Sequence, residues 1–453
     1  MAQTQPAEPL RLDGRTLEGG GQLVRIAVAL SALTGRAITI DKIRGNRQGK
    51  KGLKASHLAA VQTLGELTGS TLVKAQVGSC SMGFYPPSDR KEEGCRTDTE
   101  LDIRLPTPGS VFLVFQALYP YLLNSSSADQ IRLSIIGGTN ASCSPSYDYV
   151  SQVLIPNFMR LGLPAISLRL EKRGWSTGQV QMGKVTFVID TLRSRNEQGG
   201  LNSAFPPIDL HRYRRGSICK IDITILAPDD RLAEPDRSDW KPHRTKGKPV
   251  PAAASDEDVN QETIREFMER ETQRTLRKQL KRLPPSLFSF SGVDRKGNDV
   301  PIEVHTSEAT HYRSCLYLLI VAHTSTGFRI GRDVLYGSLR DQPRRKKGQQ
   351  KIYEDISIKV KKLVEECVER FTQEFHDPSL QTPTAIAKHQ PCVDEHMRDQ
   401  LVVFEALGRA SGVEVVQDPE SQEDERYWSL HTKTAQWVCR EMLGAESAGE
   451  TQE

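Results

Sequence analysis

The sequence lacks the features that mark secreted, membrane-spanning or zinc-binding proteins. Its eight cysteines are scattered over 453 residues, and no two form a Cys-x-x-Cys pair. That spacing argues against zinc ribbons and disulfide frameworks and favours a reducing compartment. No apolar run has the length of a membrane span, and residues 1–11 are polar and contain an acid, unlike a signal peptide. We therefore expect an intracellular chain with no membrane partner.

The chain also lacks a strong excess of charge of one sign. Its formal net charge is only +4, so any affinity for nucleic acid must come from local basic patches and not from a global field. A chain of this length can bury a large core and is expected to hold more than one module.

The most informative segment is residues 12–25. It places Glu18, three glycines and Arg25 where apolar residues begin to recur at helical spacing. A glycine-rich turn before a helix exposes backbone N–H groups and the positive end of the helix dipole, which together suit phosphate. Glu18 fits beside a phosphate if a divalent cation lies between them. The alternative is a tight turn with no ligand.

A basic loop follows a predicted strand at residues 37–41. It carries Arg44 and Arg47, three residues apart, and then Lys50 and Lys51. Guanidinium groups suit phosphate oxygens, and basic loops suit nucleic-acid backbones, so the loop is a candidate polyanion clamp. The alternative is a solvated basic loop.

These two segments resemble the RNA 3′-terminal phosphate cyclase family. The family pattern is Gly-Glu-Gly-Gly-Gly-Gln-x-x-Arg, then Ile-Arg-x-x-Arg, then Gly-Leu…His-Leu-x-x-Val; here it reads from Leu17, from Ile43 and from Gly52 to Val61. The resemblance spans about residues 12–190 and 301–443. Further matching segments follow in order at residues 109–120, 136–149, 393–401 and 431–435.

The resemblance implies an α+β fold of repeated two-helix, mixed-sheet units, the architecture of the cyclases and of EPSP synthase, with a smaller inserted α/β domain. We assign residues 1–205 and 303–453 to a discontinuous catalytic domain of about three repeats. The insertion is assigned to residues 206–302.

Composition and hydrophobic pattern predict individual elements within these domains. Residues 229–262 are rich in charge, proline and alanine, which predicts a flexible loop. An amphipathic helix is predicted at 262–283 and strand-like alternation at 287–302. The third repeat is expected from Thr326 onward, with helices at 352–375 and 393–408. An acidic loop at 417–426 is expected just before a strand that carries His431.

His431 is implied by the resemblance to be a nucleophile. Imidazole is nucleophilic near neutral pH, and its attack on the α-phosphate of ATP would give a histidine–AMP adduct. The resemblance implies that AMP then passes to an RNA 3′-phosphate. The vicinal 2′-hydroxyl attacks in turn, giving a 2′,3′-cyclic phosphate and free AMP. Such an enzyme is a ligase that forms a phosphoric ester, and its substrates are ATP and RNA with a 3′-phosphate end.

The remaining site residues follow from the same resemblance. Glu18 is expected to bind Mg²⁺ or Mn²⁺. Asp399 and Gln400 are expected to orient the nucleotide or the histidine. The residues expected to line the nucleotide and polyanion site with them are Arg25, Arg44, Arg47 and Gln116.

Three departures from the family pattern bear on substrate choice and efficiency more than on reaction class. Ser56 replaces a frequent glutamine, His323 stands where an acid is common, and Ala435 replaces a frequent asparagine.

Two other functions stay open at this point. The first is a non-catalytic, cyclase-like factor in ribosomal RNA processing and ribosome assembly, a group that lacks the histidine. The second is a plain RNA-binding protein that uses the basic residues at 44–54 and 344–347. The basic tetrapeptide at 344–347 also fits a nuclear-import signal, so we expect nuclear residence, with a solvated loop as the alternative.

Overall fold

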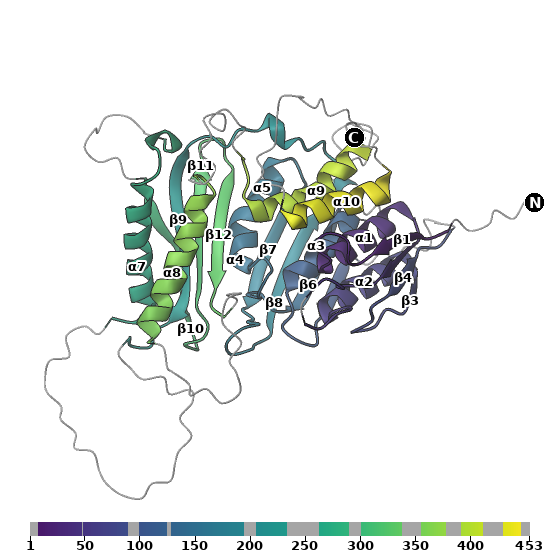
Figure 1. Cartoon of the computed structure of the whole chain (residues 1–453), viewed down its shortest axis with the longest axis horizontal. Coiled ribbons are helices and arrows are strands. Elements are labelled where there is room, and N and C mark those ends of the chain that lie inside the picture. Colours follow the sequence, from purple (N-terminus) through teal and green to yellow (C-terminus); the bar gives the residue numbers. More distant parts are fainter. Residues whose placement is uncertain are drawn as a thin grey trace, which may run out of the picture.

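The computed structural model shows two lobes side by side (Figure 1). One lobe holds two sheets with helices packed on them, and the other holds one sheet covered by α7 and α8. The structure describes residues 8–47, 49–88, 99–124, 128–193, 205–232, 262–289, 300–337, 355–376, 391–410 and 429–444. The basic tetrapeptide at 344–347, the acidic loop at 417–426 and most of the predicted loop at 229–262 lie outside these residues.

The first unit of the larger lobe is a four-stranded sheet in the order β1-β2-β4-β3. β1 and β2 are parallel and the other pairs are antiparallel. Helix α1 is buried on most of its surface because α2, α3 and α10 all pack on it. The elements are β1 (Leu10–Asp13), α1 (Gly21–Thr34), β2 (Ile38–Asp41), α2 (Ala55–Thr68), β3 (Thr71–Val73) and β4 (Met82–Tyr85).

The second unit repeats the first. Its strand order is β5-β6-β8-β7, again with one parallel pair followed by antiparallel pairs. The repeated mixed-sheet α+β architecture expected from the sequence is thereby confirmed. The elements are β5 (Glu100–Arg104), α3 (Val111–Leu123), β6 (Gln130–Gly137), α4 (Tyr147–Tyr149), a π-helical turn η2 (Val150–Leu154), α5 (Ile155–Arg160), β7 (Ile166–Lys172) and β8 (Gly183–Asp190).

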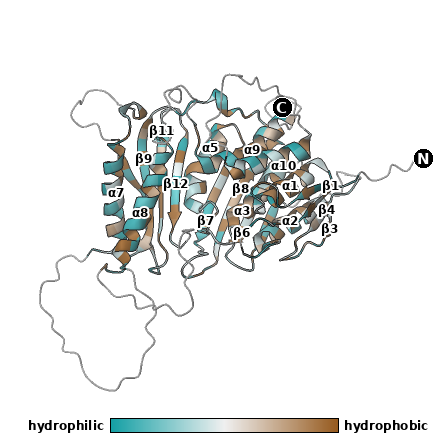
Figure 2. Ribbon diagram, in the orientation of Figure 1, coloured by the Kyte–Doolittle hydropathy of each residue, from teal (hydrophilic) through white to brown (hydrophobic). Residues whose placement is uncertain are grey.

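The second lobe has a different strand order, β10-β9-β11-β12. Helix α7 begins at a capping box in which Thr263 and Glu266 bond each other's backbone N–H groups, and it confirms the helix predicted at 262–283. Figure 2 shows hydrophilic residues over the outer side of α7 and α8. The elements are β9 (Ile218–Pro228), α7 (Ile264–Leu280), β10 (Ile302–Thr310), β11 (Tyr317–Thr324), β12 (Arg329–Leu335) and α8 (Ile356–Gln373).

The domain boundary predicted at residue 302 divides this second lobe. β9 precedes the boundary, yet it pairs with β10 and β11 beyond it, and one hydrophobic cluster runs from Ile218 to Phe375. The helix predicted at 352–375 is α8, which packs on α7 and belongs to this lobe and not to a third repeat. The third helix pair is instead α9 (Glu395–Ala410) and α10 (Leu430–Leu443), which packs on α1.

The expectation of a strand at His431 was wrong. Ser429 caps a helix by accepting the backbone N–H of Thr432, and His431 lies in its first turn. The β-branched Thr432 and Thr434 favour a strand locally. The buried Val438 and Met442 nevertheless follow Thr434 at helical spacing, and their packing decides the structure.

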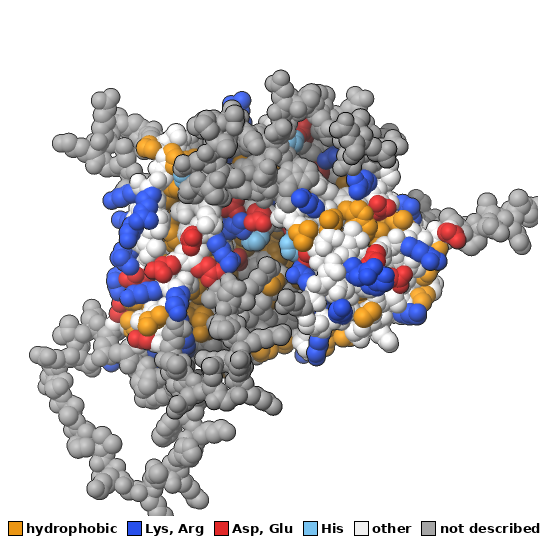
Figure 3. Space-filling view, viewed as in Figure 1, with side chains coloured by type: hydrophobic (Ala, Val, Ile, Leu, Met, Phe, Trp, Pro, Cys, Tyr) orange, Lys and Arg blue, Asp and Glu red, His pale blue; other side chains and the backbone are white. Residues whose placement is uncertain are grey.

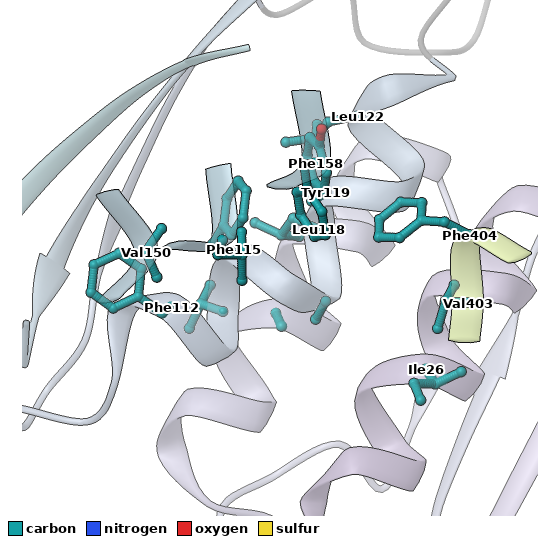
Figure 4. Close-up of a cluster of buried hydrophobic side chains, with 14 of the residues drawn as sticks. Ile26, Phe112, Phe115, Leu118, Tyr119, Leu122, Val150, Phe158, Val403 and Phe404 are labelled. Carbon is teal, nitrogen blue, oxygen red and sulfur yellow. The ribbon is translucent and has the colours of Figure 1, made fainter. Parts of the chain in front are cut away.

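An aromatic core fixes α9 against the second unit. Phe404 of α9 packs edge-on against Tyr119 of α3, with ring centroids 5.5 Å apart, and against Phe158 of α5, at 5.4 Å. Figure 4 shows these rings with Ile26 of α1 and Val403 of α9 nearby. Within the described residues, no helix is both long and apolar enough to cross a membrane.

Candidate active site

The glycine run lets two side chains approach the start of α1. Gly19 has a φ of 59°, in the left-handed region that glycine adopts most readily. A Cβ atom on Gly20 would collide with the carboxylate of Glu18, and one on Gly21 would collide with the imidazole of His57. The glycines are therefore required by close packing as well as by the turn.

His431 faces this turn from the first turn of α10. Its Nδ1 atom lies 3.1 Å from Oε1 of Gln22 and 3.7 Å from Oε2 of Glu18. The histidine side chain keeps 42% of its surface exposed, whereas the Glu18 side chain keeps 6%. The ring is thus bonded at Nδ1, and the side chain remains partly exposed to solvent.

Gln22 determines which nitrogen of His431 carries the proton. Its Nε2 atom donates to Oδ2 of Asp399 at 3.4 Å, which leaves its Oε1 atom turned to the histidine. An amide oxygen can only accept, so Nδ1 of His431 carries the proton and donates it. Nε2 of the imidazole then carries the free lone pair.

Asp399 lies at the far end of this chain of hydrogen bonds. Its carboxylate also accepts from the side-chain amide of Gln400. Burial raises the pKa of Asp399 to about 7, against the opposing effects of the Gln400 hydrogen bond and the charge of Arg25.

The start of α9, which carries Asp399, is anchored by Asp394. One carboxylate oxygen of Asp394 accepts the N–H of Met397 at 2.9 Å and the hydroxyl of Tyr149 at 2.6 Å. The other accepts the N–H of Gly331 in β12 at 3.0 Å. Both lobes therefore contribute to the placement of Asp399.

Glu18 joins three further segments at the site. Its carboxylate forms an ion pair with Arg47 of the basic loop. Its backbone N–H donates to Oγ1 of Thr434 at 3.2 Å, and that hydroxyl donates to the carbonyl of Leu430 at 2.7 Å. Neither carboxylate oxygen of Glu18 accepts a hydrogen bond of ordinary geometry from the part of the chain that the structure describes.

A basic cluster surrounds the start of α1 and α2. Burial lowers the pKa of Arg25 to about 10, although the charge of Asp399 opposes the shift. Burial, and then the charge of Arg44, lower the pKa of Lys54. Burial and then the charges of Arg25 and Arg44 lower the pKa of His57 to about 3, so it is neutral at physiological pH. The positive charges of this cluster repel one another. An anion bound among them would offset that repulsion and would therefore be stabilised.

A small cavity of about 40 Å³ adjoins Gln22. It is far smaller than the roughly 300 Å³ of an ordinary small-molecule pocket. The Nε2 atom of Gln116 is buried and has no hydrogen-bond partner among the described residues. The polar residues that line the cavity are Gln22, Arg25, Gln116, Asp399 and Gln400, and its walls include Phe115, Tyr119, Phe158 and Phe404.

Comparison with known proteins identifies the family. A sequence model described as RNA 3′-terminal phosphate cyclase matches residues 16–448. The chain belongs to the RNA 3′-terminal phosphate cyclase family. That match includes every predicted site residue, from Glu18 to His431.

Individual cyclases match over shorter stretches. An RNA 3′-terminal phosphate cyclase of Desulfurococcus amylolyticus is 40% identical over 165 residues, which cover 36% of this chain and 43% of the relative. A protein of the same name from Methylococcus capsulatus is 36% identical over 180 residues, 40% of this chain and 48% of the relative. A probable RNA 3′-terminal phosphate cyclase of Dictyostelium discoideum is 34% identical over 174 residues, 38% of each chain. Each match spans less than half of the relative.

The structure brings most of the predicted cyclase residues together. Glu18 contacts both His431 and Arg47. Asp399 reaches His431 through Gln22. The guanidinium of Arg44 donates to the carbonyl of Lys50 at 2.7 Å, and its charge acts on His57 and Lys54. The remaining predicted residues, Arg25, Gln116 and Gln400, line the cavity beside Gln22.

Two residues of the cyclase site were missed as functional candidates. Gln22 was recognised only as part of a motif, although it lies three residues from Arg25 in the predicted helix, a spacing that places helix residues near one another. Thr434, whose hydroxyl holds Glu18, was likewise recognised only as part of the matching segment at 431–435. Two departures from the cyclase pattern lie elsewhere: Ala435 is buried in the core, and His323 bonds Asp222 in the second lobe at 2.7 Å.

Asp399 should make the stability of the cyclase fold depend on pH. Its pKa is about 7 in the folded chain against 3.8 for the ordinary group. The folded state therefore binds the proton more tightly, and this stabilisation, complete below pH 4, is lost as the pH rises through 7.

Asp399→Asn should remove that loss, so above pH 7 it should exceed the wild type in free energy of unfolding by on the order of 2 kcal/mol. Urea unfolding of both proteins at pH 5 and pH 8 gives the comparison. Parallel pH dependences would show that Asp399 titrates normally.

Proposed function

We propose that the chain is an ATP-dependent RNA 3′-terminal phosphate cyclase that converts an RNA 3′-phosphate to a 2′,3′-cyclic phosphate through a histidine–AMP intermediate. The observation that carries the proposal is the contact between Nδ1 of His431 and Oε1 of Gln22. With the proton on Nδ1, Nε2 is the unprotonated nitrogen, the form that a nucleophile requires, and the side chain keeps 42% of its surface exposed.

In the first step, Nε2 of His431 attacks the α-phosphorus of ATP. A P–N bond forms, the bond from the α-phosphorus to the β-phosphate oxygen breaks, and pyrophosphate leaves with the electron pair. The substituted imidazole keeps its Nδ1 proton and gains positive charge. The Nδ1–H group donates its hydrogen bond to Oε1 of Gln22. The carboxylate of Glu18, 3.7 Å from Nδ1, stabilises the positive charge of the imidazole.

In the next two steps, AMP is transferred and then released. An oxygen of the RNA 3′-phosphate attacks the phosphorus of the adduct, and the P–N bond breaks to restore neutral imidazole. The vicinal 2′-hydroxyl then attacks the RNA phosphorus, loses its proton and displaces AMP. One ATP is consumed, and one cyclic phosphate, one AMP and one pyrophosphate are formed.

Both reactants are polyanions, and the basic cluster suits that requirement. Arg47 lies against Glu18, and Arg25 lies beside the start of α1. Figure 3 shows basic, acidic and histidine side chains gathered between the two lobes. Preorganised cations of this kind stabilise charge that develops during phosphoryl transfer.

Glu18 fits a divalent cation that is shared with phosphate. No group of three or more potential metal ligands occurs among the residues that the structure describes, so a cage built from protein alone is not the arrangement here. Mg²⁺ is commonly held by one or two carboxylates together with phosphate oxygens and water, and the buried oxygens of Glu18 meet that need. A bound Mg²⁺ or Mn²⁺ would neutralise phosphate charge.

The histidine–AMP adduct can be tested directly. The purified chain, incubated with α-labelled ATP and Mg²⁺ or Mn²⁺, should retain label after denaturation, in a bond that acid breaks and alkali does not. His431→Ala should lose all of the label because the attacking imidazole is removed. His305→Ala, which alters an exposed histidine of β10, should label normally.

An unlabelled wild-type chain with a verified fold would contradict the proposal. It would favour the non-catalytic, cyclase-like role in ribosomal RNA processing. Label that persists in His431→Ala would place the nucleophile elsewhere.

The polyanion clamp predicts a separate defect. Arg47→Ala should lower the rate of RNA cyclisation about a hundredfold, the size expected when one charged donor is removed. Arg44→Ala should lower it as well, and circular dichroism should show that both variants remain folded. Arg132→Ala, which alters an exposed arginine of β6, is the matched control. Wild-type rates in both clamp variants would exclude Arg44 and Arg47 from phosphate binding.

A further inference from the structure

Two exposed leucines flank the candidate active site. Leu17 immediately precedes Glu18 and is 40% exposed, and Leu430 immediately precedes His431 and is 50% exposed. Most large apolar side chains of the described core are buried. Exposed apolar groups placed directly beside a reactive site commonly mark a ligand contact.

The two leucines lie on backbone segments that are joined by hydrogen bonds. The N–H of Glu18, bonded to the carbonyl carbon of Leu17, donates to the Thr434 hydroxyl at 3.2 Å, and that hydroxyl donates to the carbonyl of Leu430 at 2.7 Å. One hydroxyl therefore ties the two backbones together. We call Leu17 and Leu430 the leucine shelf.

Leu17 occupies a conformation that favours glycine. Its φ is 53°, in the left-handed region that residues with a Cβ atom rarely adopt. The family pattern has glycine at this position. Because the Leu17 side chain is exposed, its burial offsets little of the backbone strain. We therefore infer that this side chain has a role other than packing in the core.

The turn that carries Leu17 is fixed to the basic loop. Glu18 pairs with Arg47, the side-chain amide of Asn46 donates to the carbonyl of Arg15, and Gly19 packs against Asn46. The leucine shelf is thus bordered by His431 on one side and by the phosphate-binding loop on the other.

We propose that the leucine shelf binds the base of the 3′-terminal nucleotide of the RNA substrate. This inference rests on the proposed cyclase function. With the terminal phosphate at Arg47, the attached base lies within reach of the shelf, and bases of single-stranded RNA present apolar faces to side chains.

RNA fits this position better than the adenine of ATP does. Glu18 and Gln22 beside His431 are buried, whereas both leucines of the shelf are exposed, so a long strand can reach them. Leucine side chains make no hydrogen bonds to base edges. The shelf should therefore accept all four bases at the RNA terminus.

The test compares two RNAs in equilibrium binding. Both are short, fluorescent and 3′-phosphorylated, and one has an abasic terminal nucleotide. The wild type should bind the base-bearing RNA about fivefold more tightly, the ratio that corresponds to roughly 1 kcal/mol. Leu17→Gly and Leu430→Ala should bind both RNAs equally, because the contact to the base is gone.

Lys74→Gly is the matched control. Lys74 is exposed and also has a φ of 53°, so its replacement relieves the same backbone strain away from the site. It should keep the fivefold preference. Leu17→Gly should melt at the wild-type temperature or above, because glycine accepts this φ.

Retained preference in Leu17→Gly and Leu430→Ala would overturn the proposal. A loss of affinity for a non-hydrolysable ATP analogue, without a change for RNA, would assign the shelf to adenine and would also overturn it. Because the binding assay needs no chemistry, a chain that forms no AMP adduct can still show the preference. Failure of the cyclase function is therefore distinguishable from failure of the shelf.

Discussion

The side-chain amide of Gln22 is the interaction on which the rest of the site depends. It bonds His431, 409 positions away in sequence, and Asp399, 377 positions away. Three helices therefore have to meet at one residue. The glycines at 19–21 allow Glu18 and His57 to approach the start of α1, the Ser429 cap starts α10 just before His431, and the result is an imidazole whose Nδ1 atom has a defined partner.

The second lobe contributes to that geometry. Gly331 of β12 bonds Asp394, which starts the helix that carries Asp399. Arg332 adds an ion pair to Glu395 at 2.9 Å. Since core packing of Phe404 fixes the other end of α9, the helix has little freedom to move relative to α1, and the amide contact is preorganised.

Local sequence patterns predicted the elements whose conformation depends mainly on neighbouring residues. The glycine turn, the basic loop and the helix at 262–283 were recognisable because turn chemistry, charge and helical spacing can be read from neighbouring residues. The limit of the inserted lobe and the helix at His431 were not predicted correctly. β9 pairs with strands beyond residue 302, and buried Val438 and Met442 outweigh two β-branched threonines. The role of Gln22 could not be predicted from local pattern, because it exists only through contacts to distant segments.

The tautomer of His431 tests this account most directly. In the full chain labelled with ¹⁵N-histidine, with His431→Ala used for assignment, NMR at a pH where the ring is neutral distinguishes protonated from unprotonated ring nitrogens. The account predicts a proton on Nδ1 and a free lone pair on Nε2, and it predicts that Gln22→Leu will lose this preference. A proton on Nε2 in the wild type would contradict the arrangement from which the nucleophile was derived.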